Sequence, residues 1–182
     1  MYQDVIMAGF GGQGILLIGD MLAQAGMMMG RNVTWMPSYG VEMRGGTANT
    51  TVVVSDRRIG SPITGKPHNA IVMNGPSLEK FGPRVRPGGV LVANLSMCDR
   101  SALERDDITA LFVPCLDIAE EAGDPKAASM VALGALIGKT DVVTFDALKQ
   151  ALESYLTGKK AKFIPVNEAA VQKGIEFAKE NG

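Results

Sequence analysis

The chain has 182 residues, with 18 lysines and arginines against 19 aspartates and glutamates, for a formal net charge of -1. Hydrophobic residues make up 46% and charged residues 20%, which excludes a disordered, highly charged tail and leaves no broad positive field for nucleic acid. No apolar run approaches the ~20 residues that span a bilayer, and the N-terminus lacks the positive flank of a signal peptide. We therefore expect a cytoplasmic protein with no membrane or nucleic-acid partner.

The length suits one domain, and we predict a single domain over residues 1–182. Cys98 and Cys115 are the only cysteines, too few for a cysteine-ligated iron–sulfur cluster, a four-cysteine zinc site or a disulfide framework. We interpret both as buried small hydrophobes. His68 has no second histidine or nearby cysteine, so the sequence predicts no metal site.

The first elements read as strand, glycine turn, helix and strand. Val5–Ala8 is an apolar run typical of a buried parallel strand, and Gly9–Gly14 forms the turn. Apolar residues at spacings of three and four predict a helix over 15–29, which Gly30 ends. A second strand is predicted at Val33–Met36.

The next segment is irregular. Pro37 is expected to close the second strand, and residues 37–49 show no sustained period, so we predict a structureless stretch there. Such a stretch in a compact domain is more often functional than idle. Thr50–Ser55 is β-branched and predicts a strand, and the residues after it predict a hairpin with Ile59-Gly60.

The remaining elements predict the fold class. In chain order they are a strand at 70–74, a helix at 77–85, strands at 90–93 and 111–114 (the latter the last central strand), and helices at 126–139, 144–155 and from Asn167 onward. Thr144 and Asn167 are suited to cap the last two helices, and Gly134 and Gly138 allow close packing. The alternation predicts an α/β fold, a three-layer sandwich with a mainly parallel sheet and a Rossmann-like first β-α-β unit.

The glycine turn has the spacing of a phosphate-binding motif. Gly9-Phe10-Gly11-Gly12-Gln13-Gly14 fits G-x-G-x-x-G between a strand and a helix, where glycines let the backbone approach a ligand and the helix N-terminus presents N–H groups to an anion. A dinucleotide site also needs an acidic residue after the second strand, where the chain has Trp35-Met36-Pro37. A nucleotide-hydrolysing loop needs Lys and Ser or Thr where Ile15-Leu16 stand. An anion site and a purely structural turn both stay open.

The irregular loop carries the second motif. Tyr39, Glu42 and Arg44 place a phenol, a carboxylate and a guanidinium among three glycines. Arginine presents a planar fork that suits a phosphate or a carboxylate. The alternative is a surface ion pair between Glu42 and Arg44, worth less than ~1 kcal/mol. We favour a functional loop, because a glycine-rich segment with a methionine at its centre is poorly explained as solvated surface.

These two segments supply the predicted cofactor-binding or interface residues. They are Gly9, Gly11, Gly12, Gln13, Gly14, Tyr39, Glu42, Arg44, Gly45 and Gly46. No catalytic residue is assigned from the sequence.

The same segments resemble the hallmark motifs of the gamma subunit of 2-oxoacid:ferredoxin oxidoreductases, the family of 2-oxoglutarate, ketoisovalerate and pyruvate ferredoxin oxidoreductases. Four further segments support the resemblance, at Ile59–Pro62, Asn74–Phe81, Pro87–Asn94 and Met130–Ala135. The resemblance covers nearly the whole chain and is greatest to the separate-subunit 2-oxoglutarate or branched-chain enzymes. The chain departs from the family at Asn69, where Asp is frequent, and at Ser129, where Asn is frequent.

The resemblance implies a pyruvate/ketoisovalerate oxidoreductase gamma-type domain in a multi-subunit enzyme. Such an enzyme oxidatively decarboxylates a 2-oxoacid with coenzyme A, giving acyl-CoA, CO2 and reduced ferredoxin. The resemblance also implies thiamine diphosphate, Mg and 4Fe-4S clusters on companion subunits. Because this chain has no Gly-Asp-Gly triplet and only two cysteines, we expect it to bind none of these cofactors alone and to be inactive alone. Its expected partners are alpha and beta subunits, a delta subunit where one exists, and ferredoxin through the complex.

Two other functions stay open from the residues. One is a stand-alone dinucleotide-binding dehydrogenase that uses the glycine turn, and the other is a nucleotide-sensing module without catalysis. The missing acidic residue after the second strand and the lack of an acid/base pair count against the dehydrogenase. The identity of the oxoacid is not encoded in this chain, because the companion subunits are expected to hold most of its pocket.

Overall fold

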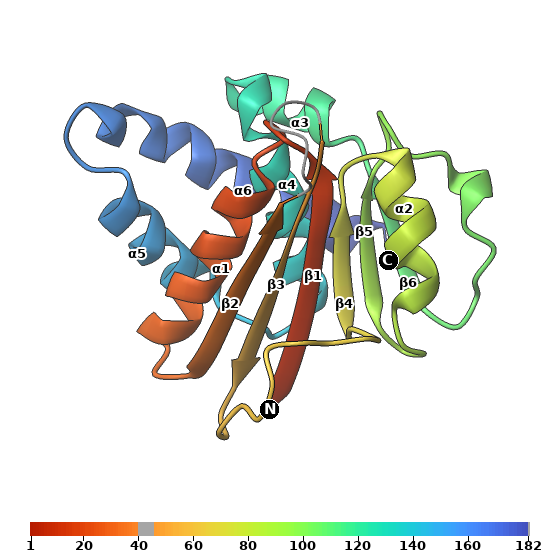
Figure 1. The fold of residues 1–182 in the computed structure, drawn as a ribbon. Coiled ribbons are helices and arrows are strands. Elements are labelled where there is room, and N and C mark those ends of the chain that lie inside the picture. Colours follow the sequence, from red (N-terminus) through yellow and green to blue (C-terminus); the bar gives the residue numbers. More distant parts are fainter. Residues whose placement is uncertain (40–45, 182) are drawn as a thin grey trace.

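A computed structural model of the chain describes residues 1–39 and 46–181. Its centre is a six-stranded sheet with the order β2-β3-β1-β4-β5-β6 (Figure 1). The strands are β1 (Tyr2–Phe10), β2 (Asn32–Tyr39), β3 (Thr47–Ser55), β4 (Asn69–Val72), β5 (Val90–Asn94) and β6 (Thr109–Val113). Neighbours from β1 to β6 pair in parallel, while β3 pairs antiparallel with both β1 and β2. The predicted mainly parallel sheet is confirmed, with β3 as the strand that runs the opposite way.

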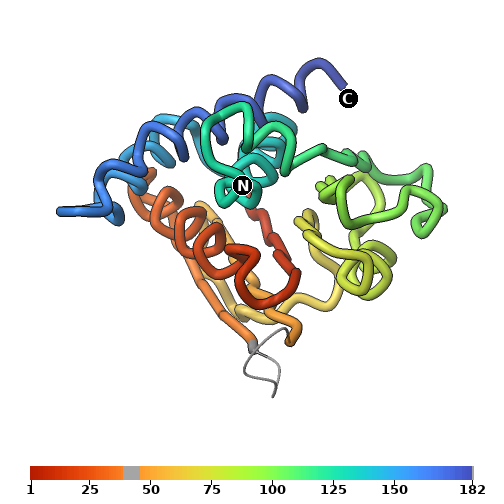
Figure 2. The backbone as a smooth tube through the Cα atoms, turned by 90° about the horizontal axis from the view of Figure 1, so that it is seen from above, coloured from red at the N-terminus to blue at the C-terminus, as the bar shows by residue number. Residues whose placement is uncertain are grey.

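Helices cover both faces of the sheet, which gives the predicted three layers (Figures 1 and 2). One face carries α2 (Gly75–Phe81), and the other carries α1 (Ile15–Met28), α3 (Cys115–Ala122), α4 (Ala128–Lys139), α5 (Phe145–Tyr155) and α6 (Ile164–Glu180). Successive side chains of β1 point to opposite faces of the sheet, so β1 contributes to the core on each face. Val5 and Met7 pack into the core of the larger helical layer, whereas Ile6 and Ala8 pack with α2.

The first β-α-β unit has a strand inserted in it. β1, α1 and β2 follow the Rossmann-like connection, but β3 lies between β1 and β2 in the sheet. In register, Gly9 of β1 pairs with Ala48 of β3, and Ala48 pairs with Tyr39 of β2. The end of β2 is therefore one strand further from the glycine turn than in a dinucleotide-binding unit.

The backbones of helices α4 and α6 lie in direct contact at two glycines. A Cβ added at Gly134 would lie 2.1 Å from the carbonyl oxygen of Val171, and one at Gly174 would lie 2.1 Å from that of Val131. The close packing predicted for the small residues of α4 therefore occurs, and its partner is α6.

The described ends of the predicted structureless stretch are strands, and its residues 40–45 lie outside the described residues. Pro37 lies inside β2, which tolerates it because β2 is an edge strand, and Thr47, Ala48 and Asn49 already belong to β3. Pairing with β1 extends β3, and pairing with β3 extends β2, beyond their local sequence patterns. The predicted hairpin at 59–60 is wrong, because the described residues from 56 to 68 contain no strand.

The C-terminal half differs from the sequence prediction in β6, in α3 and at Asn167, while the Thr144 cap is confirmed. β6 is an edge strand, and α3 follows it without having been predicted. Thr144 caps α5 as expected, accepting the backbone N–H of Ala147 at 3.2 Å. Asn167 does not cap the last helix, because α6 begins at Ile164 with a proline in its first turn, and the Asn167 side chain donates to the carbonyl of Phe163 instead.

Candidate functional site

The candidate site lies at the carboxyl ends of β1 and β4. The chain leaves β1 for α1 on one face of the sheet, and it leaves β4 for α2 on the other face. In open α/β sheets, ligands bind where two adjacent strands send their connections in opposite directions. The Gly9–Gly14 turn and Asn74 stand at this point, one after each strand.

Three glycines of the turn are required by the fold itself. Gly12 and Gly14 have φ of 94° and 77°, a region that side chains rarely adopt. A Cβ on Gly14 would also press on the hydroxyl of Ser129, and one on Gly9 would lie 2.6 Å from Oε1 of Gln13. Gly11 differs, because a Cβ there would meet only the carbonyl oxygen of Gly46 at 3.8 Å. Packing within the described residues therefore does not explain the glycine at position 11.

Gln13 fixes the turn against three neighbouring segments. Its Oε1 accepts the backbone N–H of Phe10 at 2.7 Å and the Nδ2 of Asn74 at 3.3 Å. Its Nε2 donates to the carbonyl of Met73 at 3.2 Å and contacts the sulfur of Met97 at 3.2 Å. Both polar atoms of Gln13 are thus bonded inside the chain, so the side chain of Gln13 holds the turn in position.

The two predicted motifs meet at this edge of the sheet. The N–H of Gly11 donates to the carbonyl of Gly46 at 3.0 Å, and Tyr39 ends β2 in the same row as Gly9. Glu42, Arg44 and Gly45 lie outside the described residues. The flanks of the second motif are therefore adjacent to the first, as expected of segments that serve one site.

A cleft of about 220 Å³ opens beside the turn. We call it the turn cleft, and it is lined by Gly12, Gln13, Met73, Asn94, Ser96, Met97, Leu116, Pro125, Lys126, Ala128 and Ser129. Met97 and Leu116 are 48% and 40% exposed, so one wall is apolar and open. Ser129, on the first turn of α4, is buried and also lines the cleft.

The electrostatics of the turn favour an anion. Helix α1 begins after Gly14 without a side-chain cap, and its first turn holds no acidic residue. The first N–H groups of a helix lack intrahelical acceptors and carry partial positive charge. Lys126 adds a full positive charge to the lining of the turn cleft.

The described residues hold no cluster of metal-binding side chains, and their two cysteines are buried. They contain no group of three or more His, Cys, Asp or Glu side chains that could hold a metal ion. Cys98 and Cys115 are both free and buried, as predicted. Burial raises the pKa of the Cys98 thiol to about 11 and raises the pKa of Cys115 as well, so neither is a thiolate at neutral pH. No helix in the described part of the chain has the length and apolarity to cross a membrane.

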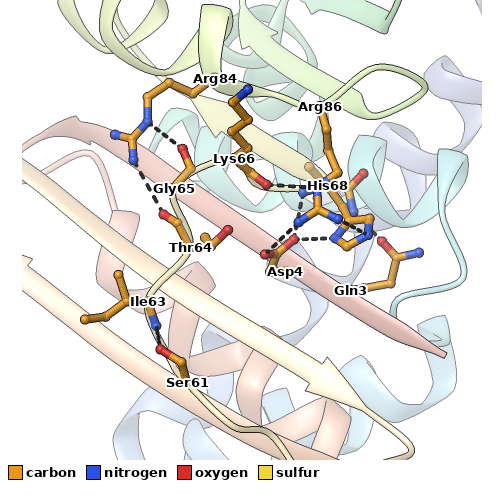
Figure 3. Close-up of polar contacts among 11 residues, drawn as sticks. Gln3, Asp4, Ser61, Ile63, Thr64, Gly65, Lys66, His68, Arg84 and Arg86 are labelled. Atoms are coloured by element: carbon orange, nitrogen blue, oxygen red, sulfur yellow. Dashed lines mark hydrogen bonds and ion pairs between the residues drawn. The ribbon is translucent and has the colours of Figure 1, made fainter.

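The opposite end of the sheet holds a buried carboxylate that sequence reasoning missed (Figure 3). Asp4 is 1% exposed and accepts the backbone N–H of His68 at 2.7 Å as well as its Nδ1. Arg86 bonds Nε2 of His68 at 3.0 Å and donates to the carbonyl of Lys66 at 2.9 Å. Burial raises the pKa of Asp4, but hydrogen bonds from Thr64 and His68 outweigh it, so the net pKa is lowered. We call Asp4, Thr64, Lys66, His68 and Arg86 the Asp4 network.

Known proteins resemble this chain over most of its length. The family described as pyruvate ferredoxin/flavodoxin oxidoreductase matches residues 4–177. The chain is 37% identical to the ketoisovalerate oxidoreductase subunit VorA of Methanothermobacter marburgensis over 97% of its length, but it spans only 37% of that relative. It is 33% identical to the 2-oxoglutarate synthase subunit KorC of Methanocaldococcus jannaschii, covering 99% of this chain and 96% of KorC.

A solved structure shares the fold. The 2-oxoglutarate:ferredoxin oxidoreductase from Magnetococcus marinus, solved with 2-oxoglutarate, coenzyme A and succinyl-CoA bound, matches with a TM-score of 0.86 and 26% identity. The match covers 100% of this chain and 32% of that one. The resemblance predicted from the two motifs is confirmed, and the chain belongs to the pyruvate ferredoxin/flavodoxin oxidoreductase family.

Proposed function

We propose that the chain is the gamma subunit of a multi-subunit 2-oxoacid:ferredoxin oxidoreductase. The complete enzyme would oxidatively decarboxylate a 2-oxoacid with coenzyme A, giving acyl-CoA, CO2 and reduced ferredoxin. The observation that carries this proposal is the match to KorC, which spans almost the whole length of both chains. VorA and the Magnetococcus enzyme are longer, so this chain corresponds to about a third of each.

The cofactors of the reaction fit companion subunits better than this chain. Two buried cysteines with raised pKa values cannot ligate a 4Fe-4S cluster, and the described residues hold no cluster of metal ligands for Mg. We therefore place thiamine diphosphate, Mg and the clusters on alpha and beta subunits, with a delta subunit as a further partner where one exists. The lone chain would then be inactive, and ferredoxin would be reached through the complex. Free buried thiols agree with a cytoplasmic enzyme.

The stand-alone dehydrogenase is not supported by the sheet order. A dinucleotide site places an acidic residue at the end of the strand next to β1, where it reaches the ribose. Here β3 occupies that position and runs antiparallel to β1, so its amino-terminal end, at Thr47, adjoins the turn. The glycine turn therefore lacks its usual dinucleotide partner.

We place the subunit junction at the edge that carries the two motifs. The turn residues Gly9, Gly11, Gly12, Gln13 and Gly14, together with Tyr39, Glu42, Arg44, Gly45 and Gly46, would face the companion chains near the active centre. Support comes from the exposure of Gly11 and Gly12 and from the bond between Gly11 and Gly46. Arg44 would clamp a carboxylate of a companion chain or a phosphate of coenzyme A, with Glu42 orienting its guanidinium.

Substituting Arg44 tests this proposal. Arg44→Ala should leave the melting temperature of the lone chain unchanged, because a loop substitution outside the core costs less than about 0.5 kcal/mol. In the complex it should lower acyl-CoA formation or weaken assembly, while Arg58→Ala, at an exposed arginine in another loop, should change neither. Unchanged melting, assembly and turnover with Arg44→Ala would remove the loop from the site. Failure of the chain to co-purify with any companion subunit would overturn the gamma-subunit function itself.

A further inference from the structure

The ring of His68, the only histidine of the chain, has a polar partner at each of its nitrogens (Figure 3). Nδ1 contacts the carboxylate of Asp4, and Nε2 lies 3.0 Å from Nη1 of Arg86. Asp4 belongs to β1, and Arg86 lies in the segment that leads into β5. The ring therefore joins two separate parts of the sheet through its two nitrogens.

The two partners select one tautomer of this ring. Burial raises the pKa of Asp4, but hydrogen bonds from Thr64 and His68 lower it by more, so the carboxylate is ionised at neutral pH and can only accept. A guanidinium stays charged and can only donate. Nδ1 must therefore carry the hydrogen that Asp4 accepts, and Nε2 must be the bare nitrogen that accepts from Arg86. A proton on Nε2 would remove the lone pair on which the second contact depends.

The side chain of Arg86 holds a second segment at the same time. Its Nε donates to the carbonyl of Lys66 at 2.9 Å, in the strand-free segment 56–68. Two other carbonyls of that segment are held separately by Arg84, at 3.1 and 3.5 Å. The Arg86 side chain is 43% exposed, so water can satisfy its guanidinium once the contact with His68 is lost.

The other charged or titratable groups that face the ring are Tyr2, Lys139 and Asp141. The ring of Tyr2, also on β1, has its centroid 5.7 Å from that of His68. Lys139 and Asp141, at the end of α4 and just after it, line with His68 a cleft of about 210 Å³. Their opposite charges offset each other at the ring, and a tyrosine is uncharged near neutral pH. Asp4 is left as the group that favours a charged ring.

We propose that His68 and Arg86 form a proton-controlled latch at the amino end of the sheet. While the ring is neutral, Arg86 stays bonded to it and to the carbonyl of Lys66. When solvent supplies a proton to Nε2, the ring keeps Asp4 but loses Arg86, because two positively charged donors then face each other. The guanidinium turns to water, and the segment 56–68 loses that hydrogen bond. Histidine is the side chain that changes charge between about pH 5 and pH 8, so the latch responds in that range.

This latch goes beyond the proposed function, since it lies at the opposite end of the sheet from both motifs and requires no companion subunit. NMR spectroscopy of the full chain labelled with 15N tests it, and a single histidine makes the ring signals unambiguous. At pH 8 we expect the tautomer with hydrogen on Nδ1. Between pH 8 and pH 5 the ring should take up a proton, and the Nε–H signal of Arg86 should shift with the same midpoint.

Three results of this titration would each overturn the latch. They are hydrogen on Nε2 at pH 8, a ring that stays neutral down to pH 5, and an Arg86 signal that does not follow the ring. None of them bears on assembly with companion subunits, so the proposed function would stand.

A pair of arginine variants separates the contact from general charge effects. Arg86→Met removes the donor that competes with the proton, and it should move the midpoint of ring protonation up by about one pH unit. Arg84→Met is the matched control, because it removes the same charge from an arginine that holds the same segment through Thr64 and Gly65. It should move the midpoint by less than about 0.3 pH unit, since its charge is screened by solvent. Equal shifts in the two variants would overturn the latch.

Discussion

The two ends of the sheet use polar residues in opposite ways. At the amino end, Asp4 is buried and bonded to His68, and Arg86 bonds His68 and Lys66, so the Asp4 network ties β1 to the segment that leads into β4. At the carboxyl end, helix α1 begins without a side-chain cap, and Gly11, Gly12 and Lys126 beside it are exposed. Buried polar groups that bond to one another indicate a structural role, whereas an exposed helix start leaves its first N–H groups open to a ligand or a partner.

The largest effect on stability is expected at the amino end. Asp4→Ala leaves the N–H of His68, its ring and the hydroxyl of Thr64 without their acceptor, and it should lower the free energy of unfolding by about 3 kcal/mol. Urea denaturation of the lone chain measures this. Asp141→Ala, an exposed carboxylate at the same end, is the control and should cost less than about 0.5 kcal/mol. Equal costs for the two variants would contradict the structural role of the Asp4 network.

At the carboxyl end, neighbouring glycines should respond differently. Gly14→Ala forces a side chain into a left-handed conformation and against Ser129, so we expect a loss of about 2 kcal/mol. Gly11→Ala makes only an ordinary contact with the carbonyl oxygen of Gly46, and its unfolding free energy should stay within about 0.5 kcal/mol of the parent in the same denaturation experiment. If Gly11→Ala nevertheless lowers turnover in the complex, position 11 touches a partner or ligand. A Gly14→Ala protein as stable as the parent would show that the turn is less constrained than the structure indicates.

The Asp4 network should also give stability a dependence on acid pH. The folded-state pKa of Asp4 is lowered below its ordinary value, so its contribution is fully present above about pH 4, where the unfolded chain is ionised too. As the pH falls, Asp4 takes up a proton in the unfolded chain before it does so in the folded chain. The stabilisation by ionised Asp4 is therefore lost as the pH falls from the unfolded-state pKa through the lower folded-state pKa. The difference in unfolding free energy between the parent and Asp4→Asn should therefore narrow below pH 4. A gap that is constant from pH 7 to pH 3 would rule out this linkage.

The smallest effect concerns the cysteines. Cys98 lies near the carboxyl end of the sheet, where its Sγ contacts the carbonyl of Val72 at 3.8 Å, and Cys115 begins α3. Because burial raises the pKa of both thiols, iodoacetamide at pH 8 should leave the folded chain unmodified and should label both cysteines in urea. Intact mass measures the extent. Rapid labelling of Cys98 in the folded chain would show that reagent reaches this side chain and that Cys98 is less buried than the structure indicates.

Local patterns predict what depends on local residues. The sequence predicts α1 from its apolar periodicity, β1 from its buried run and the Thr144 cap from its residue type. Each prediction depends only on residues within its own segment. The insertion of β3 between β1 and β2 was not readable, since it depends on pairing across the sheet. Asn167 was misread as a cap because the helix begins three residues earlier at Ile164.

The site was predictable to a similar extent. The motifs located the Gly9–Gly14 turn and the flanks of the second loop, and the bond from Gly11 to Gly46 brings them together. The role of Gln13 inside the chain required Met73, Asn74 and Met97, which lie 60 to 84 residues away. Ser129 drew attention from the sequence only as a departure from the family, and its burial against Gly14 is visible only in three dimensions.

The contact between α4 and α6 has a consequence for binding at the first turn of α4. With backbone meeting backbone at Gly134 and Gly174, neither helix can slide or rotate past the other without a collision. The contact therefore fixes the position of α4, which carries Ser129 on its first turn, against α6. A molecule that reaches this turn therefore meets a preformed surface, and little of its binding energy is used to order the protein.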